Sequence, residues 1–105
     1  MTSTFVLDTK EVEEGATKPV IIAGLRLLVC HSKGEFYVIQ NQCSHAKARL
    51  KGGKLRGCRI FCPLHSAAFD MRTGEALSAP ATGPIDVYAV HIDNGSLYID
   101  LPEGV

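Results

Sequence analysis

Apolar and β-branched residues fall into short runs along the chain, and Gly, Asn, Asp and Ser residues divide these runs. This pattern is typical of β-strands that are joined by tight turns. In the N-terminal part we expect strands at residues 5–7, 19–23, 26–31 and 35–41, with tight turns at Gly24 and at Ser32-Lys33-Gly34. Between the first two strands, a helical turn is expected at residues 8–14, with Asp8 as its N-cap.

Two further strands are expected near the C-terminus, at residues 85–92 and 96–101. They flank Asp93-Asn94-Gly95, and Asn-Gly between two apolar runs is a strong signal for a β-hairpin. No segment shows a long apolar pattern with a helical period. The predicted fold class is therefore all-β, a small antiparallel β-sandwich or barrel.

The middle of the chain has a different character. From residue 42 to residue 84 the apolar runs are shorter, and Gly, Pro, Cys and His residues accumulate. We therefore predict a loop-rich insertion of about residues 42–84 in a β-framework made of residues 1–41 and 85–105. Since 105 residues suit one domain, residues 1–105 are expected to form a single domain with this insertion as its subdomain.

The net charge is zero, because eleven basic and eleven acidic residues cancel. This balance argues against a nucleic-acid binder and against a polybasic membrane surface. The charges are nevertheless segregated, because acidic residues crowd the N-terminal part and every charge between Phe36 and Phe69 is positive. The positive residues are Lys47, Arg49, Lys51, Lys54, Arg56 and Arg59. They are either ordinary solvated loop residues or one end of a charge dipole that steers docking.

The N-terminus lacks the basic and apolar regions of a signal peptide, and the longest apolar stretch, residues 19–30, is too short to span a bilayer. We therefore expect a cytoplasmic protein without membrane attachment. Thiols stay reduced in that compartment, so the four cysteines suggest metal binding rather than disulfides.

Two short motifs carry the candidate metal ligands. They are Cys43-Ser44-His45 and Cys62-Pro63-Leu64-His65, and each supplies one thiolate and one imidazole. A single zinc ion with two Cys and two His ligands is chemically acceptable. A Rieske [2Fe–2S] cluster needs two Cys on one iron and two His on the other, which explains a repeated Cys/His pair better than zinc does.

The chain resembles the Rieske ferredoxins, above all the ferredoxin components of bacterial ring-hydroxylating dioxygenase systems, in the residues CSHAKARL, CPLHSAAFDMRTGEAL and Pro80. The resemblance implies that Cys43 and Cys62 bind the buried iron of one [2Fe–2S] cluster, and that His45 and His65 bind the outer iron. It also implies that Pro80 lies in a loop that covers the cluster. The family often has Gly after the second His, where this chain has another small residue, Ser.

The resemblance further implies a one-electron carrier that is not itself an enzyme. Its expected partners are an NAD(P)H-dependent flavoprotein ferredoxin reductase, which donates electrons, and a terminal ring-hydroxylating (di)oxygenase, which accepts them. A monomer suits such a carrier. Two other interpretations stay open: a small Rieske-like subunit of an NADH-dependent nitrite reductase, and a zinc-stabilised binding module without redox function.

The resemblance also bears on the reduction potential. High-potential Rieske proteins usually have Ser and Tyr two and four residues after the second His, where this chain has Ala67 and Phe69. Neither side chain can donate a hydrogen bond to the cluster or its ligands, so we expect a potential at the low end of the Rieske range.

The remaining cysteines and histidines lack a partner at ligand spacing. Cys30 is expected to be a buried small hydrophobe, and Cys58 a free thiol in a turn or at the start of a strand. His31 and His91 are expected to be ordinary surface or edge residues.

Overall fold

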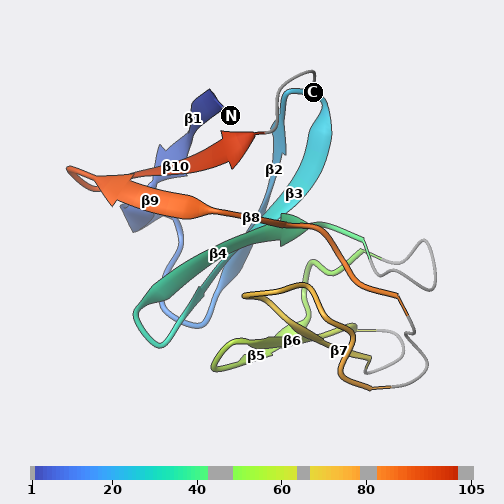
Figure 1. The fold of residues 1–105 in the computed structure, drawn as a ribbon. Coiled ribbons are helices and arrows are strands. Elements are labelled where there is room, and N and C mark those ends of the chain that lie inside the picture. Colours follow the sequence, from blue (N-terminus) through green and yellow to red (C-terminus); the bar gives the residue numbers. More distant parts are fainter. Residues whose placement is uncertain (1, 43–48, 64–66, 79–82, 102–105) are drawn as a thin grey trace.

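The computed structural model describes residues 2–42, 49–63, 67–78 and 83–101. Its strands are arranged in three antiparallel sheets, and the described residues contain one short 3₁₀ helix, η1 (Thr9–Glu11) (Figure 1). The first sheet has the order β1-β10-β9, from β1 (Thr2–Asp8), β10 (Ser96–Leu101) and β9 (Val90–Asp93). The second has the order β2-β3-β4-β8, from β2 (Thr17–Ile22), β3 (Leu25–Ser32), β4 (Glu35–Gln40) and β8 (Val87–Tyr88). The third, called here the small sheet, contains β5 (Lys54–Arg56), β6 (Arg59–Phe61) and β7 (Ala68–Asp70).

In the described part of the chain, three tight hairpins with the same turn geometry connect consecutive strands, at Ala23-Gly24, at Lys33-Gly34 and at Asn94-Gly95. In each of them both central residues have positive φ, between 50° and 79°. This is the signature of a type I′ turn, whose twist matches that of the flanking strands. The turns expected at these positions are therefore confirmed, and so is the all-β fold class.

The strand expected over residues 85–92 is instead two strands in two different sheets. β8 pairs with β4, whereas β9 pairs with β10, and Ala89 lies between them. The chain therefore changes sheets within one continuous apolar run, because Val87 packs against one core and Val90 against the other.

The expected helical turn at residues 8–14 is also shorter than predicted. Asp8 is its N-cap as expected, and Asp8 and Glu11 form a capping box. The helix ends at Glu11, and the next residue, Val12, adopts an extended conformation and is buried in the core. Burial of Val12 thus competes with continuation of the helix.

The middle sheet, β2-β3-β4-β8, has a separate apolar core on each of its faces. Alternate residues of β3 enter different cores, because side chains of a strand point to opposite sides of the sheet. Leu27 and Val29 pack toward β1-β10-β9, whereas Leu28 and Cys30 pack toward the small sheet. β3 is consequently buried on both faces and reads as a continuous apolar run. No helix among the described residues is long and apolar enough to cross a membrane.

Candidate metal centre

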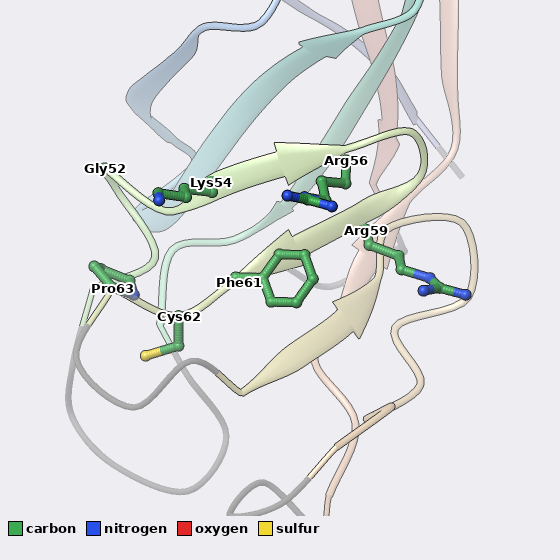
Figure 2. A pocket seen from close by; sticks show the side chains of 7 residues that line it. All are labelled: Gly52, Lys54, Arg56, Arg59, Phe61, Cys62 and Pro63. Carbon is green, nitrogen blue, oxygen red and sulfur yellow. The ribbon is translucent and has the colours of Figure 1, made fainter.

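Cys62 follows directly after β6, at one end of the small sheet (Figure 2). Its side chain is almost fully buried and forms no disulfide. The Cys62 N–H donates a hydrogen bond to the carbonyl oxygen of Ala67, with 2.7 Å between N and O. This bond closes the base of the segment 63–66, which contains the predicted ligand His65.

The other three predicted ligands, Cys43, His45 and His65, lie outside the described residues, as do Ser66 and Pro80. Within the described part of the chain, no three His, Cys, Asp or Glu side chains gather into a possible metal site. The structure therefore provides one ligand position of the predicted four, together with the residues that flank the segments 43–48, 64–66 and 79–82.

The segment that contains Cys43 and His45 is also closed at its base. Asn41 is buried at the end of β4, and its Oδ1 accepts a hydrogen bond from the Lys51 N–H at 3.0 Å. The Asn41 N–H donates to the carbonyl oxygen of Arg26 in β3. Asn41 therefore fixes both ends of residues 42–50 to the middle sheet, a role that sequence reasoning missed. Its position at the end of a predicted strand is the only sequence signal, because Asn commonly bonds to nearby backbone there.

A third pair of residues closes the segment that contains Pro80. The Ile85 N–H donates to the carbonyl oxygen of Gly74 at 2.8 Å, and the Gly74 N–H donates to the carbonyl oxygen of Asp70. Gly74 has a φ of 83°, and a Cβ there would collide with the Ile85 carbonyl oxygen. Only glycine fits this position, because the backbone of Gly74, in the turn after β7, closely approaches that of Ile85.

Gly53 provides a second close approach, just before β5. A Cβ built on Gly53 would collide with the carbonyl oxygen of Phe61, next to Cys62, and would lie 3.0 Å from that of Leu50. In the sequence, Gly52-Gly53 is a turn signal and nothing more. The need for glycine at position 53 comes from this tertiary contact.

The surroundings of Cys62 suit a buried metal–sulfur centre. Cys62 belongs to the apolar core between the small sheet and the middle sheet, together with Leu50, Ile60, Ala67 and Phe69. These side chains exclude water from one side of the thiol and offer it no competing polar partner. A buried thiol that is neither in a disulfide nor paired with a charged group is a suitable soft ligand for iron. Cys62 thus fits the predicted donor set.

Ala67 and Phe69, the two positions expected to affect the reduction potential, lie within the described residues. Ala67 and Phe69 are both fully buried in the same core as Cys62. A described hydroxyl near them, Ser78 Oγ, accepts a hydrogen bond from the backbone N–H of Ala68 at 2.9 Å. Ala67 and Phe69 therefore place no side-chain donor beside Cys62.

The other two cysteines lie as expected. Cys30 is fully buried in β3, and burial raises the pKa of its thiol to about 12, so the thiol stays protonated and unreactive. Cys58 is a half-buried free thiol in the turn between β5 and β6.

The expectation for His31 is wrong, whereas His91 is exposed as expected. His31 is half-buried and stacks on Phe36, with 4.0 Å between the ring centroids. Its Nδ1–H donates to the carbonyl oxygen of Val12 at 2.9 Å. His31 therefore has a structural role, because it joins β3 to the segment that follows η1.

Comparison with known families decides the kind of centre. The model of the Rieske [2Fe-2S] domain matches residues 2–89 of this chain. The chain belongs to the Rieske family. A Rieske-type [2Fe–2S] cluster is accordingly its prosthetic group, and the Cys/His donor set predicted from the two motifs is the one that this cluster requires.

Individual relatives agree with this assignment. The chain is 48% identical over 71 residues to the ferredoxin subunit of a 3-phenylpropionate/cinnamic acid dioxygenase from Shigella flexneri serotype 5b (strain 8401), covering 67% of each chain. Among solved structures it is similar to a Sphingomonas yanoikuyae B1 ferredoxin, with 33% identity, a TM-score of 0.88 and coverage of 96% and 100% of the two chains. It is also similar to a chain in a complex of reduced oxygenase and oxidized ferredoxin in carbazole 1,9a-dioxygenase, at 32% identity and a TM-score of 0.84, covering 92% and 91%. A putative nitrite reductase small subunit shares only 17% identity, so it shows the same fold and no more.

Proposed function

We propose that this Rieske protein is the ferredoxin component of a ring-hydroxylating (di)oxygenase system. It takes single electrons from an NAD(P)H-dependent flavoprotein reductase and delivers them to the terminal oxygenase, and it is not itself an enzyme. The observation that carries this proposal is the 48% identity with a dioxygenase ferredoxin subunit. A monomer in the cytoplasm suits this role, because a shuttle must meet two partners in turn.

Four residues would hold the cluster in this proposal. Cys43 and Cys62 would bind one iron, and His45 and His65 the other, within a cluster-binding subdomain of about residues 42–84 inserted in the framework. The bound cluster supplies one-electron redox chemistry. Hydrogen bonds at the junctions of this subdomain support the role, because Asn41, Cys62 and Ile85 each form one at the base of one of the three segments concerned.

The described residues also bear on the potential. The apolar side chains around Cys62 exclude water, and Ala67 and Phe69 offer no hydroxyl to sulfur. Fewer hydrogen bonds to sulfur stabilise the reduced, more negative state less, which lowers the potential. We expect a value near the lower limit of the Rieske range, at roughly −150 mV, which suits a donor with a reduced flavin.

The proposal is tested by metal analysis, EPR of the reduced protein and a potentiometric titration at neutral pH. We expect two irons and two sulfides per chain, in the Rieske ratio, together with a Rieske-type EPR signal that appears at low potential. Cys62→Ala should abolish the signal, whereas the matched variant Cys58→Ala should keep it, because Cys58 lies in a turn outside the motifs. Zinc without iron would overturn the proposal, and a potential well above zero would contradict the role assigned to Ala67 and Phe69.

A further inference from the structure

The outer face of the small sheet gathers positive charge beside Cys62. In the register of the sheet, Arg56 is opposite Arg59 and Lys54 is opposite Phe61. Since side chains alternate along a strand, these four residues share one face. Leu55, Ile60 and Phe69 lie on the opposite face, toward the core. We call Lys54, Arg56, Arg59 and Phe61 the basic face.

The basic face lines a groove that reaches Cys62 (Figure 2). The groove has a volume of about 640 Å³, and Gly52 and Pro63 complete its lining. The three cations are exposed, and the half-buried ring of Phe61 lies between Arg59 and Cys62. A molecule seated in the groove would therefore touch the end of the sheet where a predicted cluster ligand lies.

These cations have no partner within the described part of the molecule. No ion pair there involves Lys54, Arg56 or Arg59. Asp70 is the register partner of Arg59 in β7, but its carboxylate is bound by Arg72, whose Nη2 lies 3.0 Å from Asp70 Oδ2. Like charges opposite each other, such as Arg56 and Arg59, destabilise a sheet. The basic face thus keeps a repulsion that an external anion would relieve.

Glu11 and Glu14, two acidic residues of the N-terminal part, are in contrast already engaged. Glu11 forms an ion pair with Lys18 at 2.8 Å. Glu14 accepts hydrogen bonds from the N–H groups of Lys33 and Gly34, at 2.7 Å and 2.8 Å. Because these two carboxylates are occupied within their own molecule, they are poor partners for the basic face of a second copy of the chain.

We propose that the basic face docks a carboxylate-rich surface of the terminal oxygenase. The inference rests on the proposed function, and the oxygenase is chosen because a similar ferredoxin chain is seen in a complex with its oxygenase. Guanidinium groups bind carboxylates through two parallel hydrogen bonds, and Phe61 supplies an apolar contact near Cys62. Complementary charges accelerate encounter more than they strengthen a small, transient interface.

The test measures electron transfer from the dithionite-reduced protein to the oxygenase component of the 3-phenylpropionate/cinnamic acid dioxygenase of Shigella flexneri serotype 5b (strain 8401), at several ionic strengths. The variant is Arg56→Gln/Arg59→Gln, which removes the repulsive pair and so leaves the sheet at least as stable. The control, Lys10→Gln/Lys33→Gln, removes the same charge from exposed positions in the N-terminal part. Reduction potentials of all three proteins are measured alongside, so that a change in driving force is recognised.

We expect the Arg56/Arg59 variant to lose about tenfold in second-order rate at low salt, and the difference to vanish at high salt. The control should stay within about twofold of the wild type, because its charges lie away from the contact. Equal rates for the variant and the control would overturn the basic face as a docking site. Reduction of the same proteins by a flavoprotein reductase is measured separately, and a loss confined to that step would also overturn the proposal, because the acidic partner would then be the donor. A wild-type protein that carries the cluster but reduces no oxygenase would instead overturn the proposed function.

Discussion

The two faces of the middle sheet are covered by very different neighbours. One face packs against β1-β10-β9, in which β1 and β10 have seven and six residues and pair over most of their length. The other packs against the small sheet, whose three strands have three residues each. Main-chain pairing therefore stabilises the first side. The second side depends on core contacts, on the close backbone approaches at Gly53 and Gly74, and on the hydrogen bonds that Asn41, Cys62 and Ile85 form.

This difference indicates where the cluster matters for stability. The small sheet is short, and repulsion among its three cations further reduces its stability. Its few main-chain hydrogen bonds do little to offset the conformational entropy that is lost when the adjoining segments are ordered. A bound metal centre that ties two loops together adds free energy to that side alone. The framework side, in contrast, buries Leu97, Ile99 and Val29 without help from the ligand loops.

The largest expected effect is that of removing the cluster. Chelation of iron, or Cys62→Ala, should lower the hydrogen-exchange protection of the β6 and β7 amides by about a hundredfold or more, because structural metal binding contributes several kcal/mol. Protection in β3 and β10 should change far less. Mass spectrometry of exchange in the two forms measures both, and an equal loss on both sides of the middle sheet would refute the comparison.

Truncation in the two cores separates stability from cluster environment. Ile60 and Leu97 are both fully buried, one in each core. Ile60→Ala and Leu97→Ala should each cost about 2–5 kcal/mol in free energy of unfolding, measured by denaturant titration. Only Ile60→Ala should alter the visible and EPR spectra, because Ile60 shares its core with Cys62. Identical spectra for the two variants would show that the cores are not divided as described.

The sequence predicted the framework better than the insertion, for physical reasons. Turn chemistry is local, so Asn94-Gly95 and Gly24 could be assigned from neighbouring residues alone. The division of the 85–92 run between two sheets could not be assigned in this way. Ala89 carries no turn signal, and the switch from one sheet to the other depends on which strands lie nearby in the fold. Asn41 likewise acts through a contact with Lys51 that only the fold creates.

The candidate site divides in the same way. Ligand identity is a matter of spacing and donor chemistry, so the two Cys/His motifs indicated a Rieske centre. The sequence also indicated part of the basic face, because Lys54, Arg56 and Arg59 belong to a segment in which every charge is positive. That three cations share one face with Phe61, beside Cys62, depends on strand register and on the short turn at Cys58. Register is a tertiary property that a run of charges does not reveal.

A smaller effect is expected from Gly53→Ala. The added methyl group would press against the carbonyl oxygens of Phe61 and Leu50, and overpacking of this kind costs about 1–3 kcal/mol. Gly83→Ala is the matched control, because a Cβ at Gly83 meets nothing within 4 Å and its φ is ordinary. The control should stay within about 0.5 kcal/mol of the wild type in thermal or denaturant unfolding. Equal stability of the two variants would mean that β5 can shift freely, contrary to the close approach described.

The smallest effect is an acid dependence on the framework side. Hydrogen bonds from the N–H groups of Gly34 and Lys33 lower the pKa of Glu14 below its usual value of 4.5. A lowered folded-state pKa adds stability that is fully present above the unfolded value and is lost as the pH falls through the folded one. Glu14→Gln should therefore make the free energy of unfolding decline less steeply below about pH 4.5. It should leave the visible and EPR spectra at neutral pH unchanged, and it should loosen the hairpin of β3 and β4.

Asp70→Asn provides the counterpart on the other side of the middle sheet, because hydrogen bonds from the Arg72 side chain lower the pKa of Asp70. Its acid response should appear in the exchange of β7 instead, and a response of the same amides to both substitutions would mean that the two sides unfold as one unit in acid.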